Sequence, residues 1–242
     1  MGRLFEELDY RPTPMGALSL RRRRDLSRGV DVYEIKLGDE FLMTSLHTAS
    51  EVALADLALA ALAGRDALAV VAGGLGLGYT AHAALKNEAV RSLTVIEALD
   101  AVIDWHRQGI LPLGAALVDD PRCRLLHGDF FTLAGEPAGI FSSPDGRERV
   151  DAILVDIDHA PDKLLSPSHA AFYSTAGLAR LSEHLAPGGV FGLWSNDPAD
   201  DAFIERLAQA FVDPRAHTVR FENAGGDGEA ACTVYLARKS GA

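Results

Sequence analysis

The stretch Val70-Val71-Ala72-Gly73-Gly74-Leu75-Gly76-Leu77-Gly78 decides the fold of this chain. It has the pattern of a buried strand that runs into four glycines and then into a helical sequence. Glycines let a ligand approach the backbone closely, and the first amides of the following helix are free to bind it. The stretch therefore predicts a ligand-binding loop at Gly73, Gly74, Gly76 and Gly78. A tight turn without a ligand is the alternative.

The sequence on the C-terminal side of this loop alternates between strand and helix patterns. Apolar runs at 92–97, 123–129, 150–156 and 190–195 are separated by helical stretches around 79–88, 98–107 and 168–186. This alternation is typical of a parallel sheet covered by helices on both faces.

The C-terminal part of the chain does not continue the alternation of strand and helix patterns. After a helix near 199–211, two strands at 217–223 and 230–237 flank a Gly-Gly-Asp-Gly loop that is too short for a crossover helix. They must form an antiparallel hairpin. The fold class is thus α/β, a doubly wound, mainly parallel sheet ending in an antiparallel hairpin, which is the outline of the class I methyltransferase-like Rossmann fold.

The sequence before the glycine loop predicts a separate small β region. Alternating runs at 17–20 and 30–37 are joined by turn-prone steps, and the four arginines at 21–24 are expected in a solvated turn. Thr48 and Glu51 have the spacing of a capping box at the start of an Ala/Leu-rich helix. We therefore divide the chain into an N-terminal β region, 1–47, and a main domain, 48–242.

Composition limits the classes of function. The chain has 242 residues, 48% of them apolar, and a net charge of −11, which disfavours nucleic acid and anionic membranes as partners. Its two cysteines are far apart and its histidines lack metal-ligand spacing, so we expect no metal site. The start has no apolar signal-peptide core, and no run approaches the length of a membrane span. A cytoplasmic protein is the expectation.

Two acidic residues follow the second and third strands of the expected sheet. Glu97 lies 19 residues after Gly78, where an acidic side chain can hold both hydroxyls of a ribose. Asp129 closes the third strand, where a carboxylate faces the crevice and can accept from an exocyclic adenine amine. A chance surface position is the alternative for Glu97.

The fourth strand ends in a loop that concentrates acidic and basic groups. Asp156 ends the strand, and Asp158 and His159 follow it directly. This crowding predicts the catalytic base at Asp156, with helix capping by either aspartate as the alternative. Tyr173 opens the next helix and is expected either to line an acceptor site or simply to pack.

The order of the glycine loop, Glu97, Gly128-Asp129, Asp156 and Pro187-Gly188-Gly189 resembles the spermidine synthase branch of the class I S-adenosylmethionine-dependent methyltransferase superfamily. The resemblance covers roughly residues 40–240. The segments DDPR (119–122), VDIDHAP (155–161) and LWSNDP (193–198) are similar to those of short bacterial spermidine synthase-like proteins.

The resemblance implies specific roles. The glycine loop, Glu97 and Asp129 would bind S-adenosylmethionine or its decarboxylated form as donor substrate, and Asp156 would deprotonate a small amine acceptor. A homodimer is also implied.

Three segments depart from the aminopropyltransferase pattern. Gly76 stands where those enzymes carry an Asp that meets the donor's amine, and Ser50-Glu51-Val52 stands where they carry Tyr-His-Glu. The usual D-S-x-D-P is replaced by residues 156–161, so Asp158 is expected to take part in diamine recognition.

The sequence thus predicts a transferase that moves an aminopropyl or methyl group to a small amine. The alternatives are a small-molecule methyltransferase unrelated to polyamines, a nicotinamide-dependent oxidoreductase and a non-catalytic nucleoside-binding module. Residues 76–81 fit the loose dinucleotide form G-x-G-x-x-A, but the C-terminal hairpin and the lack of a Tyr-x-x-x-Lys pattern disfavour the oxidoreductase.

Overall fold

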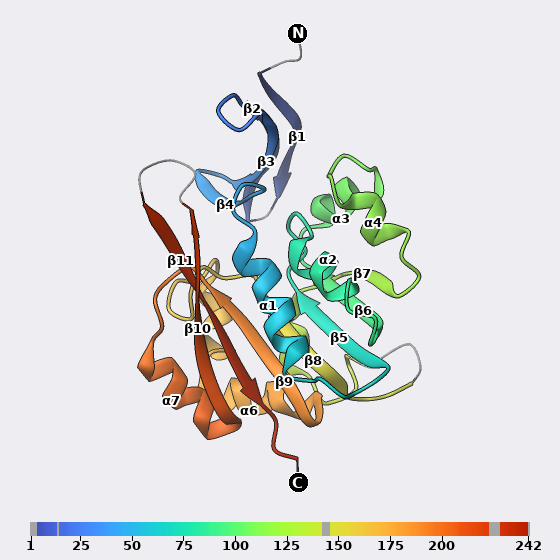
Figure 1. Ribbon diagram of the computed structural model, residues 1–242, viewed down its shortest axis with the longest axis vertical. Coiled ribbons are helices and arrows are strands. Elements are labelled where there is room, and N and C mark those ends of the chain that lie inside the picture. Colours follow the sequence, from blue (N-terminus) through green and yellow to red (C-terminus); the bar gives the residue numbers. More distant parts are fainter. Residues whose placement is uncertain (1–3, 14, 142–145, 223–227, 242) are drawn as a thin grey trace.

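The computed structural model describes residues 4–13, 15–141, 146–222 and 228–241, and it contains two separate β-sheets (Figure 1). The smaller sheet is an antiparallel meander of β1 (Phe5–Thr13), β2 (Gly16–Asp25), β3 (Val30–Leu37) and β4 (Glu40–Thr44). The expected N-terminal β region is therefore a four-stranded sheet. We propose residue 47 as the last residue of this region and residue 48 as the first of the main domain.

The larger sheet has seven strands in the order β10-β11-β9-β8-β5-β6-β7. They are β5 (Leu68–Gly73), β6 (Val90–Glu97), β7 (Cys123–His127), β8 (Val150–Val155), β9 (Leu185–Ser195), β10 (Val212–Glu222) and β11 (Glu229–Arg238). Strands β5 to β9 are parallel, whereas β11 runs antiparallel to both neighbours. This topology confirms the predicted fold class.

The helices cover both faces of the larger sheet. They are α1 (Ala49–Ala60), α2 (Tyr79–Leu85), α3 (Asp100–Arg107), α4 (Gly114–Val118), α5 (Phe130–Gly135), α6 (Thr175–Glu183) and α7 (Asp201–Ala210), with a 3₁₀-helix η1 (Pro167–Ala171). Val70 of β5 packs into the cluster that includes α1, α2 and α3, and its neighbour Val71 packs into the cluster of α5, α6 and α7. Burial on both sides explains why β5 is apolar throughout.

The strand order places a switch point between β5 and β8. From β5 the chain continues to β6 and β7 on one side, and it then crosses back to β8 on the other side. The loops after these two strands diverge there and leave a crevice at their carboxyl ends, which is the common ligand position in such sheets.

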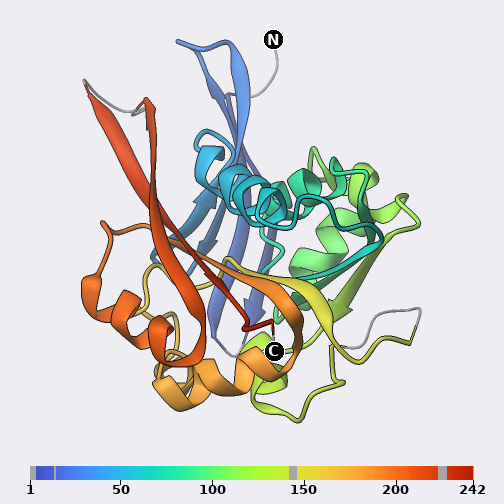
Figure 2. The same cartoon turned by 60° about the horizontal axis from the view of Figure 1, so that its bottom comes forward.

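The small sheet closes this end of the molecule. Leu18, Leu20, Ile35 and Leu37 belong to the same buried cluster as α1 and α2. In Figures 1 and 2 the far end of the β10–β11 hairpin reaches toward the small sheet. The rings of His47, just after β4, and Phe221 of β10 lie 5.3 Å apart between their centroids.

The capping box predicted before α1 is wrong. Thr48 is the N-cap residue but makes no side-chain cap hydrogen bond. Glu51 is buried, and its carboxylate accepts from the Ser50 hydroxyl at 2.7 Å. The side chain of Glu51 points into the molecule because α1 packs that face against the sheet.

The predicted arginine turn is also wrong, because residues 21–24 lie inside β2. Acidic partners on the neighbouring strands compensate their charge. Arg22 pairs with Glu6 of β1 at 2.7 Å, and Arg23 pairs with Glu34 of β3 at 2.6 Å.

Two further expectations need adjustment. The helix expected over 168–186 consists of η1 and α6, because the Ser174 hydroxyl accepts from the Gly177 amide and starts a new helix there. The Gly-Gly-Asp-Gly loop lies outside the described residues except for Gly228.

In the part of the chain that the structure describes, no helix has the length and apolar character needed to cross a membrane.

Candidate active site

A cavity of about 960 Å³ lies at the carboxyl ends of the parallel strands, and the small sheet forms part of its wall. Its lining includes Met43, Glu51, Gly74, Gly76, Glu97, Asp129, Phe131, Asp156, His159, His169, Trp194 and Phe221. Ligand sites usually enclose about 300–1,000 Å³. The cavity is therefore large enough for a nucleoside together with a second small molecule.

Two glycines of the loop after β5 line the cavity, as expected, and both have positive φ. Gly74 has φ +91°, and a Cβ there would overlap the carbonyl oxygen of Asp156. Gly76 has φ +47°, and a Cβ there would overlap the sulfur of Met43. Met43 belongs to β4, and its sulfur also accepts a hydrogen bond from the Leu77 amide at 2.9 Å. The thioether of Met43 thus fills the space beside Gly76.

The other two glycines of the loop serve packing. A Cβ on Gly73 would lie 2.7 Å from the ring of Phe130, and one on Gly78 would lie 2.6 Å from Leu117. Neither glycine lines the cavity. Their contribution is to let the loop lie close to α4 and α5.

Glu97 lies in the cavity wall at the end of β6, as predicted. Its Oε2 accepts from the Leu75 amide and its Oε1 from the Leu99 amide, each at 2.9 Å. Burial raises the pKa of this carboxyl group, and hydrogen bonds from backbone amides oppose the rise. The amides of Gly76 and Ala98 also act on this carboxylate, so a ligand hydroxyl would share it with backbone donors.

Asp129 also reaches the cavity, but its carboxylate already has partners. It is the N-cap of α5, where Oδ1 accepts from the Phe131 amide at 2.9 Å and Oδ2 accepts from the Thr132 hydroxyl at 2.8 Å. The side chain therefore fixes the start of α5 whether or not it contacts a ligand.

Asp156 and Glu51 form a pair of neighbouring carboxyl groups in the cavity wall. Asp156 accepts from the Thr80 hydroxyl at 2.8 Å, and burial raises its pKa to about 6. Burial, with the charge of Asp156 as a smaller cause, raises the pKa of Glu51 to about 7. Near neutral pH this pair is able to accept a proton, which is the property required of a general base.

Glu51 is a site residue that our sequence analysis assigned to a helix cap. Its signal in the sequence is weak, since one acidic residue at the start of an Ala/Leu-rich helix is typical of a cap. Only the packing of α1 against β8 and β9 brings it to Asp156.

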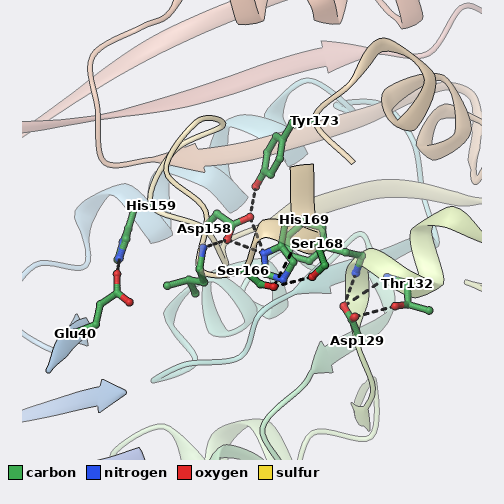
Figure 3. A network of polar contacts seen from close by, with 11 residues as sticks. Glu40, Asp129, Thr132, Asp158, His159, Ser166, Ser168, His169 and Tyr173 are labelled. Carbon is green, nitrogen blue, oxygen red and sulfur yellow. Dashed lines mark hydrogen bonds and ion pairs between the residues drawn. The ribbon is translucent and has the colours of Figure 1, made fainter. Parts of the chain in front are cut away.

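The structure does not place Asp158 and Tyr173 in the cavity wall, where acceptor recognition would require them. Asp158 points inward because three donors converge on its carboxylate (Figure 3). These are the Tyr173 hydroxyl at 2.9 Å, the Leu165 amide at 2.7 Å and Nδ1 of His169 at 2.8 Å. His159 does line the cavity, and its Nε2 lies 2.9 Å from Oε1 of Glu40 on β4.

The remaining wall is largely apolar and aromatic. Trp194, His47 and Phe221 contribute side chains from β9, the end of the small sheet and β10. The indole Nε1 of Trp194 is buried and has no hydrogen-bond partner among the described residues. The surface that this side of the wall presents to the cavity is thus mainly apolar.

Comparison with solved structures finds the same fold in spermidine synthases. The crystal structure of spermidine synthase from Thermotoga maritima matches with a TM-score of 0.73 and 17% identity, over 97% of this chain and 73% of that chain. A spermidine synthase in complex with the transition state analogue AdoDATO matches with a TM-score of 0.72 and 16% identity, over 97% and 72%. A probable spermidine synthase from Corynebacterium glutamicum matches with a TM-score of 0.62 and 17% identity, over 95% and 79%.

No family model matches the sequence, and no curated protein sequence matches it. At 16–17% identity the structural likeness establishes the fold alone. The activity has to be inferred from the residues of the site. The chain has the α/β fold of the spermidine synthase structures, with a small antiparallel sheet before a seven-stranded, mainly parallel sheet.

Proposed function

We propose that this protein is a transferase that moves an aminopropyl group from decarboxylated S-adenosylmethionine to a small amine. One observation carries the proposal. A single cavity holds Glu97 beside the glycine loop and, in another part of its wall, the carboxyl pair of Asp156 and Glu51. A carboxylate suited to a ribose and a base suited to an ammonium group are thus present in one site.

The chain's residues fit a donor of this kind. Backbone amides fix the Glu97 carboxylate in the cavity wall, and carboxylate oxygens are suitable acceptors for ribose hydroxyls. Positive φ favours glycine at positions 74 and 76, so the loop exposes backbone to the cavity at these two positions. Support for the decarboxylated donor comes from the fold shared with a spermidine synthase bound to AdoDATO.

Asp156 removes the proton that blocks the reaction. The ammonium proton of the acceptor first passes to the carboxylate of Asp156. The amine nitrogen then forms a bond to the carbon next to the sulfonium, the carbon–sulfur bond breaks, and its electron pair stays on sulfur. Holding nitrogen and carbon in line supplies much of the acceleration, since a thioether is a good leaving group. Glu51 adds negative charge that attracts a cationic acceptor.

Methyl transfer from S-adenosylmethionine is the second candidate, and the contact between Gly76 and Met43 favours it. No carboxylate lies at position 76 to bind the amine of a decarboxylated donor or to repel the carboxylate of the complete one.

Calorimetry with methylthioadenosine tests the proposal. We expect the wild-type protein to bind this nucleoside and not NAD, and Glu97→Ala to weaken binding by about 1.5–3 kcal/mol, the value of hydrogen bonds to a charged group. Glu205→Ala on α7, outside the cavity lining, is the control. Thermal melts verify that each variant folds. Binding of NAD alone, or equal affinity of Glu97→Ala, would contradict the donor assignment.

A further inference from the structure

His169 is a largely buried side chain of the cavity wall that the proposed transfer does not use. It belongs to η1, and 10% of its side-chain surface is exposed. Its Nδ1 lies 2.8 Å and 3.1 Å from the two carboxylate oxygens of Asp158 (Figure 3). Its ring stacks on Phe131 with 3.9 Å between centroids. The imidazole is therefore fixed on one edge and one face.

Asp158 also decides which ring nitrogen carries the proton. A carboxylate accepts and does not donate, and this one already accepts from the Tyr173 hydroxyl and the Leu165 amide. Nδ1 of His169 must then donate, which leaves Nε2 of the neutral ring as an acceptor. Nε2 makes no hydrogen bond to any described residue. An oriented acceptor in the cavity wall thus has no partner within this part of the protein.

The position of His169 indicates which part of a ligand it meets. Figure 3 shows it near Asp129 and Thr132. His169 and Asp129 both line the cavity, and the purine of an adenosyl donor is expected beside Asp129. Both oxygens of Asp129 already accept from groups of α5. We propose that Nε2 of His169 accepts a hydrogen bond from the exocyclic amine of the donor's purine, with Asp158 as its positioning residue. This inference rests on the proposed function.

A pair of nucleosides tests it by calorimetry. Methylthioinosine carries an oxo group in place of the amine of methylthioadenosine, so an acceptor in the wall disfavours it. We expect wild-type protein to prefer methylthioadenosine by about tenfold. His169→Asn keeps a donor near the Nδ1 position and removes Nε2, and we expect it to reduce the preference roughly 3- to 10-fold.

Two controls separate recognition from general damage. Tyr173→Phe removes one donor to Asp158 and leaves Nε2 in place, so the preference should persist. His217→Phe removes an imidazole from β10, outside the cavity lining, and should change neither affinity. Nitrogen NMR of the labelled histidines in wild-type protein adds a readout that needs no variant, because Nε2 of His169 should shift on binding methylthioadenosine.

The outcomes are distinct. An undiminished preference in His169→Asn, or a preference lost in Asp129→Asn alone, overturns the assignment to His169. Wild-type protein that binds both nucleosides equally also overturns it but leaves the proposed function standing. If wild-type protein binds neither nucleoside, the proposed function fails and the assignment fails with it.

Discussion

Asp156 combines a hydrogen bond from Thr80 with a place in the cavity wall, so its negative charge is both held and accessible. Asp156→Asn keeps the shape of this side chain and removes the basic oxygen. We expect turnover to fall by about 10²–10⁴, the usual contribution of a positioned base, while donor affinity survives. Release of methylthioadenosine or S-adenosylhomocysteine from both donors, with putrescine and other amines as acceptors, measures the rate. Full activity in this variant would contradict the base assignment.

The carboxyl pair also predicts a pH dependence of turnover. Burial raises the pKa of both groups, to about 6 for Asp156 and about 7 for Glu51, and as neighbours they lose their two protons in separate steps. Only the deprotonated base accepts a proton. At saturating acceptor we therefore expect kcat to rise with pH through about 6 and then level off. Glu51→Gln should keep this rise, because burial, the main cause of the raised pKa of Asp156, remains.

The measurement is a pH–rate profile of the wild-type protein and both variants. The residual activity of Asp156→Asn should lack the rise near pH 6. A rise that is the same in all three proteins would show that another group, such as the acceptor itself, controls the rate.

At the scale of the element, the start of α5 depends on one carboxylate. Asp129 accepts from the Phe131 amide and the Thr132 hydroxyl, and Asp200 caps α7 in the same way by accepting from the Ala202 amide. Asp129→Ala should lower the free energy of unfolding by about 1 kcal/mol, the typical value of an N-cap. Urea unfolding measures it, and Asp200→Ala is the matched variant with a similar expected loss. An unchanged stability in Asp129→Ala would mean that the hydrogen bonds of this cap contribute no net free energy.

Met43 of β4 limits which side chain can stand at position 76 in the loop after β5. Met43 from β4 lies against Gly76 and accepts from the Leu77 amide, so an Asp at position 76 would have to displace it. The glycine at position 76 is therefore linked to a side chain from the small sheet, 33 residues earlier in the chain.

At the scale of the whole molecule, the net charge of −11 and the carboxylates of the cavity favour a cationic acceptor over an anionic one. Exposed large apolar side chains are concentrated in the N-terminal part of the chain. They include Leu4, Phe5, Tyr10, Met15, Leu26, Val30 and Phe41. Met15 and Phe41 also line the cavity, and the other exposed apolar side chains of this region offer a surface for contact with another chain.

We therefore predict that the protein is a homodimer that uses the small sheet as its contact. Sedimentation analysis should show a dimer for the wild type. The double variant Phe5→Asp, Tyr10→Asp should weaken association at least about tenfold, because it places charges in an apolar contact. Val212→Asp, at an exposed apolar position of β10, is the control. A monomeric wild-type protein would contradict the prediction.

The sequence by itself determined the arrangement of the larger sheet and the position of its site. Apolar runs without alternation require a sheet buried on both faces, and parallel strands bring their carboxyl ends to one edge. This is why Glu97, Asp129 and Asp156 could be expected in one crevice from their places at strand ends alone, and all three line the cavity.

Only the tertiary structure decided where individual side chains point. Glu51 reaches Asp156 through the packing of α1, Asp158 turns away from the cavity toward His169 and Tyr173, and the arginines of β2 become strand residues because acidic partners lie on β1 and β3. In each case the direction is set by contacts between segments far apart in sequence or by several donors that converge on one group. Local periodicity carries no information about such contacts, since it fixes which face a residue occupies within its own element and not what the neighbouring element presents to it.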